Sequence, residues 1–340
     1  MKGKHTPLAK RLRKAAGLLA ALTLLVPLCA VTGHAEETNH QLTISFAGDC
    51  CVSTYQGKSA PGSLNWYAQK NPPDYFFKNV ASVFQSDDIT VVNCETVLTN
   101  RWLSGRGKSG KAYWFRGPAS NAKIFSSGGV EIASVANNHT GDYGQAGMRD
   151  TVAALKAQGV TPAEANKPVY IEKNGIRVGF LACGIWSSGQ ISGIAKIVQG
   201  MTKVSDIQIV YPHGGTEGVH TPEKWRMTGF RQLIDAGADI VVANHAHVLQ
   251  PMELYHGKTI VYGLGNFCFG GNRHPENRTA IFQVKAAKNA DGTFTYEDQV
   301  IPCYVYTGKT NNWQPMMINE ADADYQKIKD FMIWKRGTPV

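Results

Sequence analysis

An α/β layered fold is what the sequence predicts, and two observations carry that prediction. Seven short apolar runs have the length and composition of buried strands. Segments with apolar residues at helical spacing lie between some of these runs. Because strands that alternate with helices pack in layers, we expect sheets that are covered by helices.

The expected elements follow one another along most of the chain. Strands are predicted within 41–49, 87–95, 131–139, 178–184, 207–215, 238–247 and 259–267. Helices that stop at a glycine are predicted within 144–159 and 223–237. The less regular stretches 55–77 and 188–200 indicate loops and short helices. From about residue 304 the pattern loosens into a tail with one amphipathic candidate near 322–334.

Residues 1–35 have the composition of a secretory signal. A basic segment without acids precedes an apolar stretch, and small residues follow at Gly33 and Ala35. We expect cleavage after Ala35 and therefore an exported, extracytoplasmic protein. The alternative is an uncleaved anchor, because the apolar stretch is at the lower limit of a bilayer span.

The overall charge is dominated by this first segment. The formal net charge is +9, and the six basic residues of 1–35 leave +3 on the remainder. This balance gives no indication of nucleic-acid binding. Seven cysteines scattered over 340 residues do not form a disulfide framework. Cys94 and Cys268 both fall near strand ends, where an oxidised pair is conceivable.

Polar residues that can bind metals stand at the ends of five predicted strands. Sites in α/β sheets gather at the carboxyl ends of strands, so these residues are expected to meet. On an extended chain, His245 and His247 point to the same side. Carboxylate, amide and imidazole groups together suit Zn, Fe or Mn. The candidate ligands are Asp49, Glu95, Asn138 or His139, His213, His245 and His247.

Each of these residues also has an ordinary explanation when it is taken alone. Gly48-Asp49 is a common strand-to-turn sequence, and the Asn-Asn-His segment at 137–139 is typical of a turn. A single His-x-His motif binds metal in a minority of cases. The combination along the chain favours the metal-site interpretation.

The same segments carry a resemblance to a known family. FAGD, ITVVNCET, SVANNHTGDYGQAGMRDTVAAL, PHGGTE and LIDAGADIVVANHAHVLQPMELYHGKTIVYGLGNF resemble the CapA family, the poly-γ-glutamate capsule synthesis proteins. That family is similar in fold to the calcineurin-like metallophosphatases. The resemblance implies a four-layer α/β/β/α sandwich over 41–304, with 305–340 as a C-terminal tail.

The resemblance also implies roles for individual residues. Two metal ions would hold a phosphate group and lower the pKa of a bridging water. His139 would assist the leaving group, with Asp142 orienting its imidazole; the alternative for Asp142 is a helix N-cap. The implied metal ligands are Asp49, Glu95, Asn138, His213, His245 and His247.

Three positions depart from the family pattern. Cys51 stands where the first metal motif of the phosphatases, Asp-x-His, has its histidine. Its thiolate is a competent zinc ligand, and the simpler interpretation is a small buried apolar residue. Glu95 stands where an aspartate that bridges two metal ions is usual, and its longer side chain would shift the bridging carboxylate. Gly214 stands where a bulky aromatic residue is usual, which predicts open space beside His213.

Four further residues are candidates for substrate contacts. Asn93 and Asn266 lie at strand ends, Glu217 matches the family's H-x-G-x-E pattern, and Arg116 is a possible anion contact. Taken alone, Asn93 is also explained as a helix cap, Asn266 as part of a Gly-Asn turn, and Arg116 as an exposed arginine.

The predicted function is that of a CapA-like exported protein in the synthesis or export of poly-γ-glutamate or a related surface polymer. Its site would bind divalent metal and act on an anionic polymer or a phosphoester. Its expected partners are membrane-bound capsule synthesis or export proteins. The alternatives are a general extracytoplasmic metal-dependent phosphoesterase, and a non-catalytic scaffold or binding subunit on the same fold.

Overall fold

The computed structural model describes residues 40–105, 113–270, 274 and 276–333. The predicted signal sequence at 1–35 lies outside these residues. None of the helices in the described ranges is long and apolar enough to cross a bilayer.

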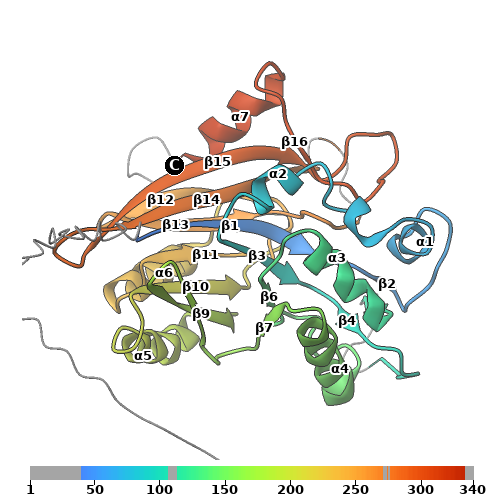
Figure 1. The fold of residues 1–340 in the computed structure, drawn as a ribbon, viewed down its shortest axis with the longest axis horizontal. Helices are drawn as coiled ribbons and strands as arrows, with labels where there is room; N and C mark the ends of the chain where they lie inside the picture. Colours follow the sequence, from blue (N-terminus) through green and yellow to red (C-terminus); the bar gives the residue numbers. More distant parts are fainter. Residues whose placement is uncertain (1–39, 106–112, 271–273, 275, 334–340) are drawn as a thin grey trace, which may run out of the picture. The chain divides into compact units, whose positions relative to one another are not determined.

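Two large sheets form the centre of the molecule (Figure 1). The first has the strand order β16-β15-β14-β1-β3-β6-β7 and the second the order β12-β13-β11-β10-β9-β8. The first comprises β1 (Gln41–Cys50), β3 (Ile89–Cys94), β6 (Ile132–Ser134), β7 (Thr161–Ala163), β14 (Arg278–Lys288), β15 (Phe294–Tyr304) and β16 (Met316–Met317). The second comprises β8 (Val169–Lys173), β9 (Ile176–Gly184), β10 (Ile207–His213), β11 (Ile240–Val242), β12 (Leu249–Tyr255) and β13 (Lys258–Leu264).

Apolar side chains fill the space between the two sheets. Leu42, Ile44 and Phe46 alternate along β1 and are fully buried in this inner core. The ring of Phe46 lies 6.3 Å from that of Tyr211 on β10 and 5.9 Å from that of Phe282 on β14. The inner core therefore joins the sheets face to face.

Helices cover the outer faces of both sheets. A second buried cluster packs the first sheet against α2 (Ala81–Phe84), α3 (Ala122–Ser127) and α4 (Gly144–Ala157), and α1 (Leu64–Ala68) adjoins it. A third cluster packs the second sheet against α5 (Ile191–Met201) and α6 (Lys224–Asp235). The short 3-10 helices are η1 (Pro73–Tyr75), η2 (Ala119–Asn121) and η3 (Ser188–Gln190). This arrangement confirms the predicted four-layer sandwich.

A small third sheet lies beside the main body. It has the order β2-β5-β4 and is formed by β2 (Thr54–Tyr55), β5 (Phe115–Gly117) and β4 (Val97–Leu98). The strands β4 and β5 pair in parallel, and β2 pairs with β5 in the antiparallel sense. No strand was predicted here, because each one is only two or three residues long.

The segment 188–200 differs from its prediction. It was expected to form loops and short helices, but it leads into the eleven-residue helix α5. Ile191, Ile194 and Val198 recur at helical spacing and are buried against α6 and the second sheet. The glycines within this helix, Gly193 and Gly200, hid that pattern, and packing overrides their low helix propensity.

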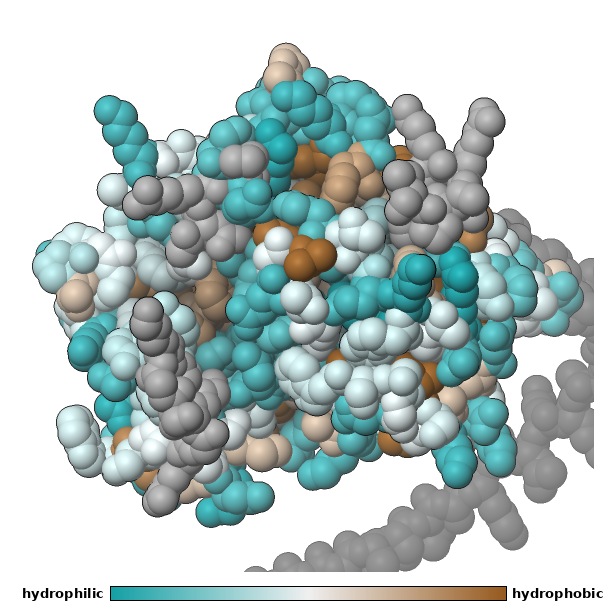
Figure 2. All heavy atoms as spheres, turned by 180° about the vertical axis from the view of Figure 1, so that it is seen from behind, coloured by the Kyte–Doolittle hydropathy of each residue, from teal (hydrophilic) through white to brown (hydrophobic). Residues whose placement is uncertain are grey.

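The segment after residue 304 contributes to the inner core. The strand β16 pairs with β15, and the helix α7 (Ala323–Met332) lies where an amphipathic segment was predicted. Its residues Ile328 and Met332 are buried with the core between the sheets. The rear surface, by contrast, is mainly hydrophilic with scattered apolar spots (Figure 2).

Candidate metal centre

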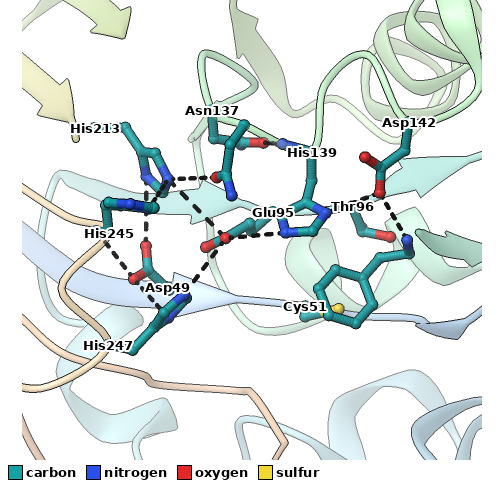
Figure 3. Close-up of polar contacts among 12 residues, drawn as sticks. Asp49, Cys51, Glu95, Thr96, Asn137, His139, Asp142, His213, His245 and His247 are labelled. Carbon is teal, nitrogen blue, oxygen red and sulfur yellow. Dashed lines mark hydrogen bonds and ion pairs between the residues drawn. The ribbon is translucent and has the colours of Figure 1, made fainter. Parts of the chain in front are cut away.

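The carboxyl ends of strands from both large sheets meet at one place (Figure 3). The strands β1, β3 and β6 run parallel to one another, as do β9, β10, β11 and β13. Parallel strands end at the same edge of a sheet, so their terminal residues gather there. Asp49 comes from β1, Glu95 from the end of β3, and His213 from β10.

A close approach of two backbones fixes the position of Asp49. A Cβ atom at Gly48 would lie 1.9 Å from the carbonyl oxygen of Gly265, so only glycine fits at residue 48. The Asp49 N–H donates to the Gly265 carbonyl at 2.9 Å, and the Phe267 N–H donates to the Asp49 carbonyl at 2.8 Å. These bonds join β1 to the end of β13 and bring Asn266 beside Asp49.

Glu95 lies at the centre of the cluster and is fully buried. Within the described part of the chain, its Oε1 has no hydrogen-bond partner. The Nε2 atoms of His139 and His247 each lie 3.7 Å from this oxygen, and His213 Nε2 lies 4.0 Å away. These separations are too long for hydrogen bonds and fit an intervening ion, since zinc lies about 2.0–2.2 Å from N and O ligands. Burial, followed by repulsion from Asp49, raises the pKa of Glu95 well above its ordinary value.

Asp49 carries the opposite electrostatic character. Burial alone would raise its pKa, but hydrogen bonding to His247 and the charges of His247 and His213 outweigh burial and lower the pKa to about 2. Asn93 donates to Asp49 Oδ1 at 2.7 Å, and the His245 backbone N–H donates to Oδ2 at 3.2 Å. Asp49 is therefore an ionised, firmly positioned acceptor.

The three later histidines differ in their preferred charge. Burial lowers the pKa of His213 well below its ordinary value and also lowers that of His245. His247 is buried too, but the charge of Glu95 and the hydrogen bond to Asp49 outweigh burial and raise its pKa to about 10. Neutral imidazoles are metal ligands, and a protonated His247 neutralises the carboxylates when no cation is present.

Two groups of potential ligand atoms share Glu95. Asp49, Glu95 and His213 form one group, and Glu95, His245 and His247 form the other; the ligand atoms of each lie within 4.8 Å of one another. Asn138 Oδ1 lies 2.9 Å from His213 Nε2 and adjoins the first group. The donor types, the shared carboxylate and its unpartnered oxygen all fit divalent cations.

The loop with the His-x-His motif adopts an unusual backbone. His245 and His247 were predicted to point to the same side of an extended chain, but the chain is not extended there, because β11 ends at Val242. Both histidines have positive φ, 94° for His245 and 57° for His247. This conformation is strained for residues other than glycine, and such strain clusters at functional sites. The loop curls to bring both rings to the centre.

His139 and Asp142 form a pair at the edge of the cluster. His139 Nδ1 lies 2.8 Å from Asp142 Oδ2, which also accepts the backbone N–H of Phe115 at 2.8 Å. Tyr143, and not Asp142, occupies the N-cap position of α4, so the capping alternative is wrong. The carboxylate instead orients the imidazole so that Nε2 faces Glu95.

The four residues predicted to contact substrate occupy different places. Asn93 is fully buried, and its amide group bridges Asp49, Glu95 and His213. Asn266 and Glu217 line a cavity of about 860 Å³ beside the cluster. Arg116 is not among its lining residues; its guanidinium lies 5.2 Å from the ring centres of Trp102 and Tyr143.

The cysteines do not join the cluster. The Cys51 thiol lies 3.5 Å from Ser53 Oγ and belongs to neither ligand group. Burial raises its pKa, which disfavours the thiolate that zinc binding needs. The six described cysteines, Cys94 and Cys268 included, are free, so the conceivable oxidised pair is not formed.

Several residues at the site were missed by sequence reasoning. Asn137, next to the predicted Asn138, donates to Asn93 Oδ1 at 3.0 Å and accepts the His139 backbone N–H at 3.0 Å. The Asn-Asn-His segment was the signal, but it does not say which asparagine faces which neighbour. Phe115 contacts the ring of His139 and Phe269 that of His247. Neither was predicted, because the sequence argument considered only polar residues at strand ends.

The predicted open space beside His213 is filled. The Trp186 ring lies 6.0 Å from the His213 ring and 5.0 Å from the His245 ring. A glycine is required at residue 214 by the backbone and not to leave open space beside His213, because a Cβ there would lie 2.0 Å from the Ile185 carbonyl oxygen. An aromatic group therefore covers the histidines from another strand end.

A four-layer sandwich with carboxylates and histidines at its strand ends defines the metallophosphatase-like class of fold. Residues 43–271 match the family model described as bacterial capsule synthesis protein PGA_cap. The chain belongs to this family.

Curated relatives agree with the family. A PGA biosynthesis protein CapA of Bacillus subtilis is 27% identical over 275 residues, which cover 74% of this chain and 70% of the relative. A capsule biosynthesis protein CapA of Bacillus anthracis is 27% identical over 316 residues, covering 86% and 74%. Among solved structures, a hypothetical protein of Thermus thermophilus aligns with a TM-score of 0.47 at 11% identity, over 77% of this chain and 99% of that one.

Proposed function

We propose that this chain is an exported protein of poly-γ-glutamate or related surface-polymer synthesis, with a metal-dependent hydrolytic or transfer activity on a phosphoester. Glu95 Oε1, which lies among three imidazoles and accepts no hydrogen bond from a described residue, carries the proposal of activity. Membership of the capsule synthesis family and the CapA relatives support the polymer role. The basic and apolar segment at 1–35 supports export.

The residues that would hold the cations are the two groups that share Glu95. Asp49, Glu95 and His213 would form one site, with Asn138 beside it, and His245 and His247 would complete the other with Glu95. Divalent ions bound there would polarise a phosphoryl oxygen and offset its negative charge. Membrane-bound capsule synthesis or export proteins are the proposed partners.

His139 would supply the proton for the leaving group. Asp142 accepts a hydrogen bond from Nδ1, which leaves Nε2 directed toward the centre of the cluster. A protonated Nε2 can donate to an oxygen that departs from phosphorus. Asn93 keeps Asp49 and Glu95 in place through its amide group.

The test separates catalysis from metal binding. Hydrolysis of bis(4-nitrophenyl) phosphate and 4-nitrophenyl phosphate is measured for the purified protein supplied with Zn²⁺ or Mn²⁺. We expect His139→Asn to lower kcat by about 100-fold or more while the metal content stays unchanged. His256→Asn is the matched control, because His256 is an exposed histidine at the turn between β12 and β13.

A second candidate function, a non-catalytic binding subunit, is favoured by Cys51 in place of the phosphatase histidine. A deletion strain distinguishes the two. If the polymer is restored equally by the wild-type gene and by the His139→Asn gene, the protein acts as a scaffold and the enzymatic proposal fails. We expect restoration by the wild-type gene alone.

A further inference from the structure

Three aromatic side chains form a row that begins at His139 and reaches the small sheet. The Phe115 ring lies 4.5 Å from the His139 ring, the Tyr113 ring lies 5.9 Å from that of Phe115, and the Tyr55 ring lies 5.9 Å from that of Tyr113. Tyr113 lies two residues before Phe115, just outside β5, and the two rings are stacked with an angle of 12° between their planes. Tyr55 is the register partner of Phe115 between β2 and β5.

In this row, Phe115, Tyr113 and Tyr55, the two tyrosines are more exposed than the phenylalanine beside the metal centre. Phe115 is half-buried, whereas Tyr55 and Tyr113 are 37% and 62% exposed. All three line the cavity of about 860 Å³ that contains His139 and His247. Aromatic surface left exposed inside a cavity is typical of ligand recognition.

A lysine stands at the outer end of the row. Lys58 Nζ lies 5.4 Å from the centre of the Tyr55 ring, and Lys58 is the one lysine or arginine among the described lining residues. It forms no ion pair with a described acid. The acids that line the cavity are Glu217, 3.8 Å from His245, and Glu276, 3.0 Å from His220. An anion in this cavity is therefore favoured beside Lys58.

Two further aromatic residues, Phe269 and Trp313, line the same cavity. The Phe269 ring lies 5.9 Å from that of Phe115 and 5.1 Å from that of His247. Trp313 lines the cavity, and its Nε1–H donates to the Gly62 carbonyl at 2.9 Å. The cavity is therefore lined by aromatic rings from several segments, which suits a ligand with a flat apolar face.

We propose that Phe115, Tyr113 and Tyr55 with Lys58 form the subsite for the organic leaving group, and that this group contains a ring with an apolar face and an anionic substituent at its far end. The proposal rests on the proposed function, because it takes His139 as the proton donor. The row begins at the ring of His139, so an oxygen that leaves toward His139 carries its substituent onto Phe115 and Tyr113. Both aryl rings and sugar rings have such a face.

Non-hydrolysable phosphonates test the subsite by binding alone. Affinities of methylphosphonate, phenylphosphonate, 4-carboxyphenylphosphonate and a glucosyl C-phosphonate are measured by calorimetry with the Zn²⁺-supplied protein. We expect the better of the two ring classes to bind about 2- to 10-fold more tightly than methylphosphonate. The tighter class identifies the leaving group as aryl or glycosyl. The 4-carboxylate should add about 2- to 5-fold.

Paired variants assign these gains to residues. Tyr113→Ala should remove the ring preference and leave methylphosphonate unchanged, whereas Lys58→Gln should remove only the carboxylate gain. Tyr170→Ala is the control for the tyrosine, because Tyr170 is a 38%-exposed tyrosine on β8 outside the cavity. Lys196→Gln on α5 is the control for the lysine.

A ligand without phosphorus makes the test independent of the metal centre. Binding of 4-methylbenzoate to metal-free protein, followed by saturation-transfer NMR, should weaken in Tyr113→Ala and Lys58→Gln and persist in both controls. The subsite is contradicted if ring phosphonates bind no better than methylphosphonate, or if Tyr113→Ala leaves 4-methylbenzoate binding unchanged. Absence of turnover with an intact ring preference would instead contradict the catalytic proposal alone.

Discussion

Glu95 is a residue whose effect on stability is opposite to its effect on function. Its carboxylate is buried, one oxygen has no hydrogen-bond partner among the described residues, and its pKa is raised by burial and by Asp49. Such an arrangement is unfavourable in a protein without a bound cation and favourable with one. Proteins tolerate this kind of local cost at binding sites.

Glu95→Gln should therefore have opposite effects on two quantities. It removes the charge and keeps the shape, so the metal-free protein should unfold at a higher temperature. Metal affinity should fall by about 100-fold or more, because one shared ligand is lost. Calorimetric unfolding and metal titration check the two effects; a variant that is less stable and binds metal normally would contradict this role.

Metal affinity should rise with pH because the buried pair of His247 and Glu95 holds a proton in the metal-free protein. Burial would lower the pKa of His247, but the charge of Glu95 and the hydrogen bond to Asp49 raise it to about 10. Binding must displace this proton, so affinity falls as pH falls below about 10. The expected slope is about tenfold per pH unit for each proton released. Titrations between pH 6 and 9, in buffers of different ionisation enthalpy, measure it; a flat profile would contradict it.

The sequence indicated the polar part of the site better than its surroundings. Asp49, Glu95, His213, His245 and His247 were predicted because each follows an apolar strand, and parallel topology does bring them together. The left-handed loop that carries the last two histidines and the aromatic covering by Trp186 depend on tertiary packing. Local spacing carries no information about either feature.

At the scale of elements, the turn that precedes β3 carries a second unfavourable carboxyl group, that of Asp87. Asp87 Oδ1 is buried and has no partner among the described residues, while Oδ2 accepts from Thr90 Oγ1 at 2.7 Å. Burial raises the Asp87 pKa to about 7. Because the folded-state pKa exceeds the unfolded one, the protonated group's contribution to stability is full below pH 3.8 and is lost as pH rises through 7.

Asp87→Asn should consequently stabilise the protein at pH 8 by about 1 kcal/mol, after allowance for solvent screening, and have little effect at pH 4. Urea unfolding at the two pH values measures the difference. Asp330→Asn is the control, because Asp330 is exposed on α7. Equal effects of Asp87→Asn at both pH values would be inconsistent with a buried, titrating carboxyl group.

Elements were predictable where their periodicity was strong. The strands β1, β3, β9 and β10 are mainly apolar and mostly buried, and α4 ends near the predicted glycine stop. The long hairpin of β14 and β15 was missed, because β15 is partly exposed and mixes polar and apolar residues. Its place in the sheet is determined by pairing with β14.

At the scale of the whole molecule, the segment after residue 304 helps to complete the core between the sheets. Ile328 and Met332 on α7 are buried with residues of both sheets, and Arg278 on β14 pairs with Asp324 at 2.8 Å. A helix held by both apolar and ionic contacts is expected to unfold together with the sandwich.

Ile328→Ala should lower the free energy of unfolding by about 2–4 kcal/mol, because it removes a buried side chain and leaves a cavity. Lys327→Ala should change it by less than about 1 kcal/mol, since the lysine is exposed and its ion pair with Asp324 is weak. Denaturant unfolding compares the adjacent variants. If both change stability equally little, α7 is not part of the cooperative core.

The most direct test of the account is the metal content of the purified protein with and without the two histidine side chains of the His-x-His motif. After exposure to Zn²⁺ or Mn²⁺ and removal of free ions, mass spectrometry should find bound metal in the wild-type protein. The double variant His245→Ala/His247→Ala should lose most of it, while His256→Ala retains it. A wild-type protein that binds neither ion, or a double variant that binds as much as wild type, would contradict the assignment of this cluster as a metal centre.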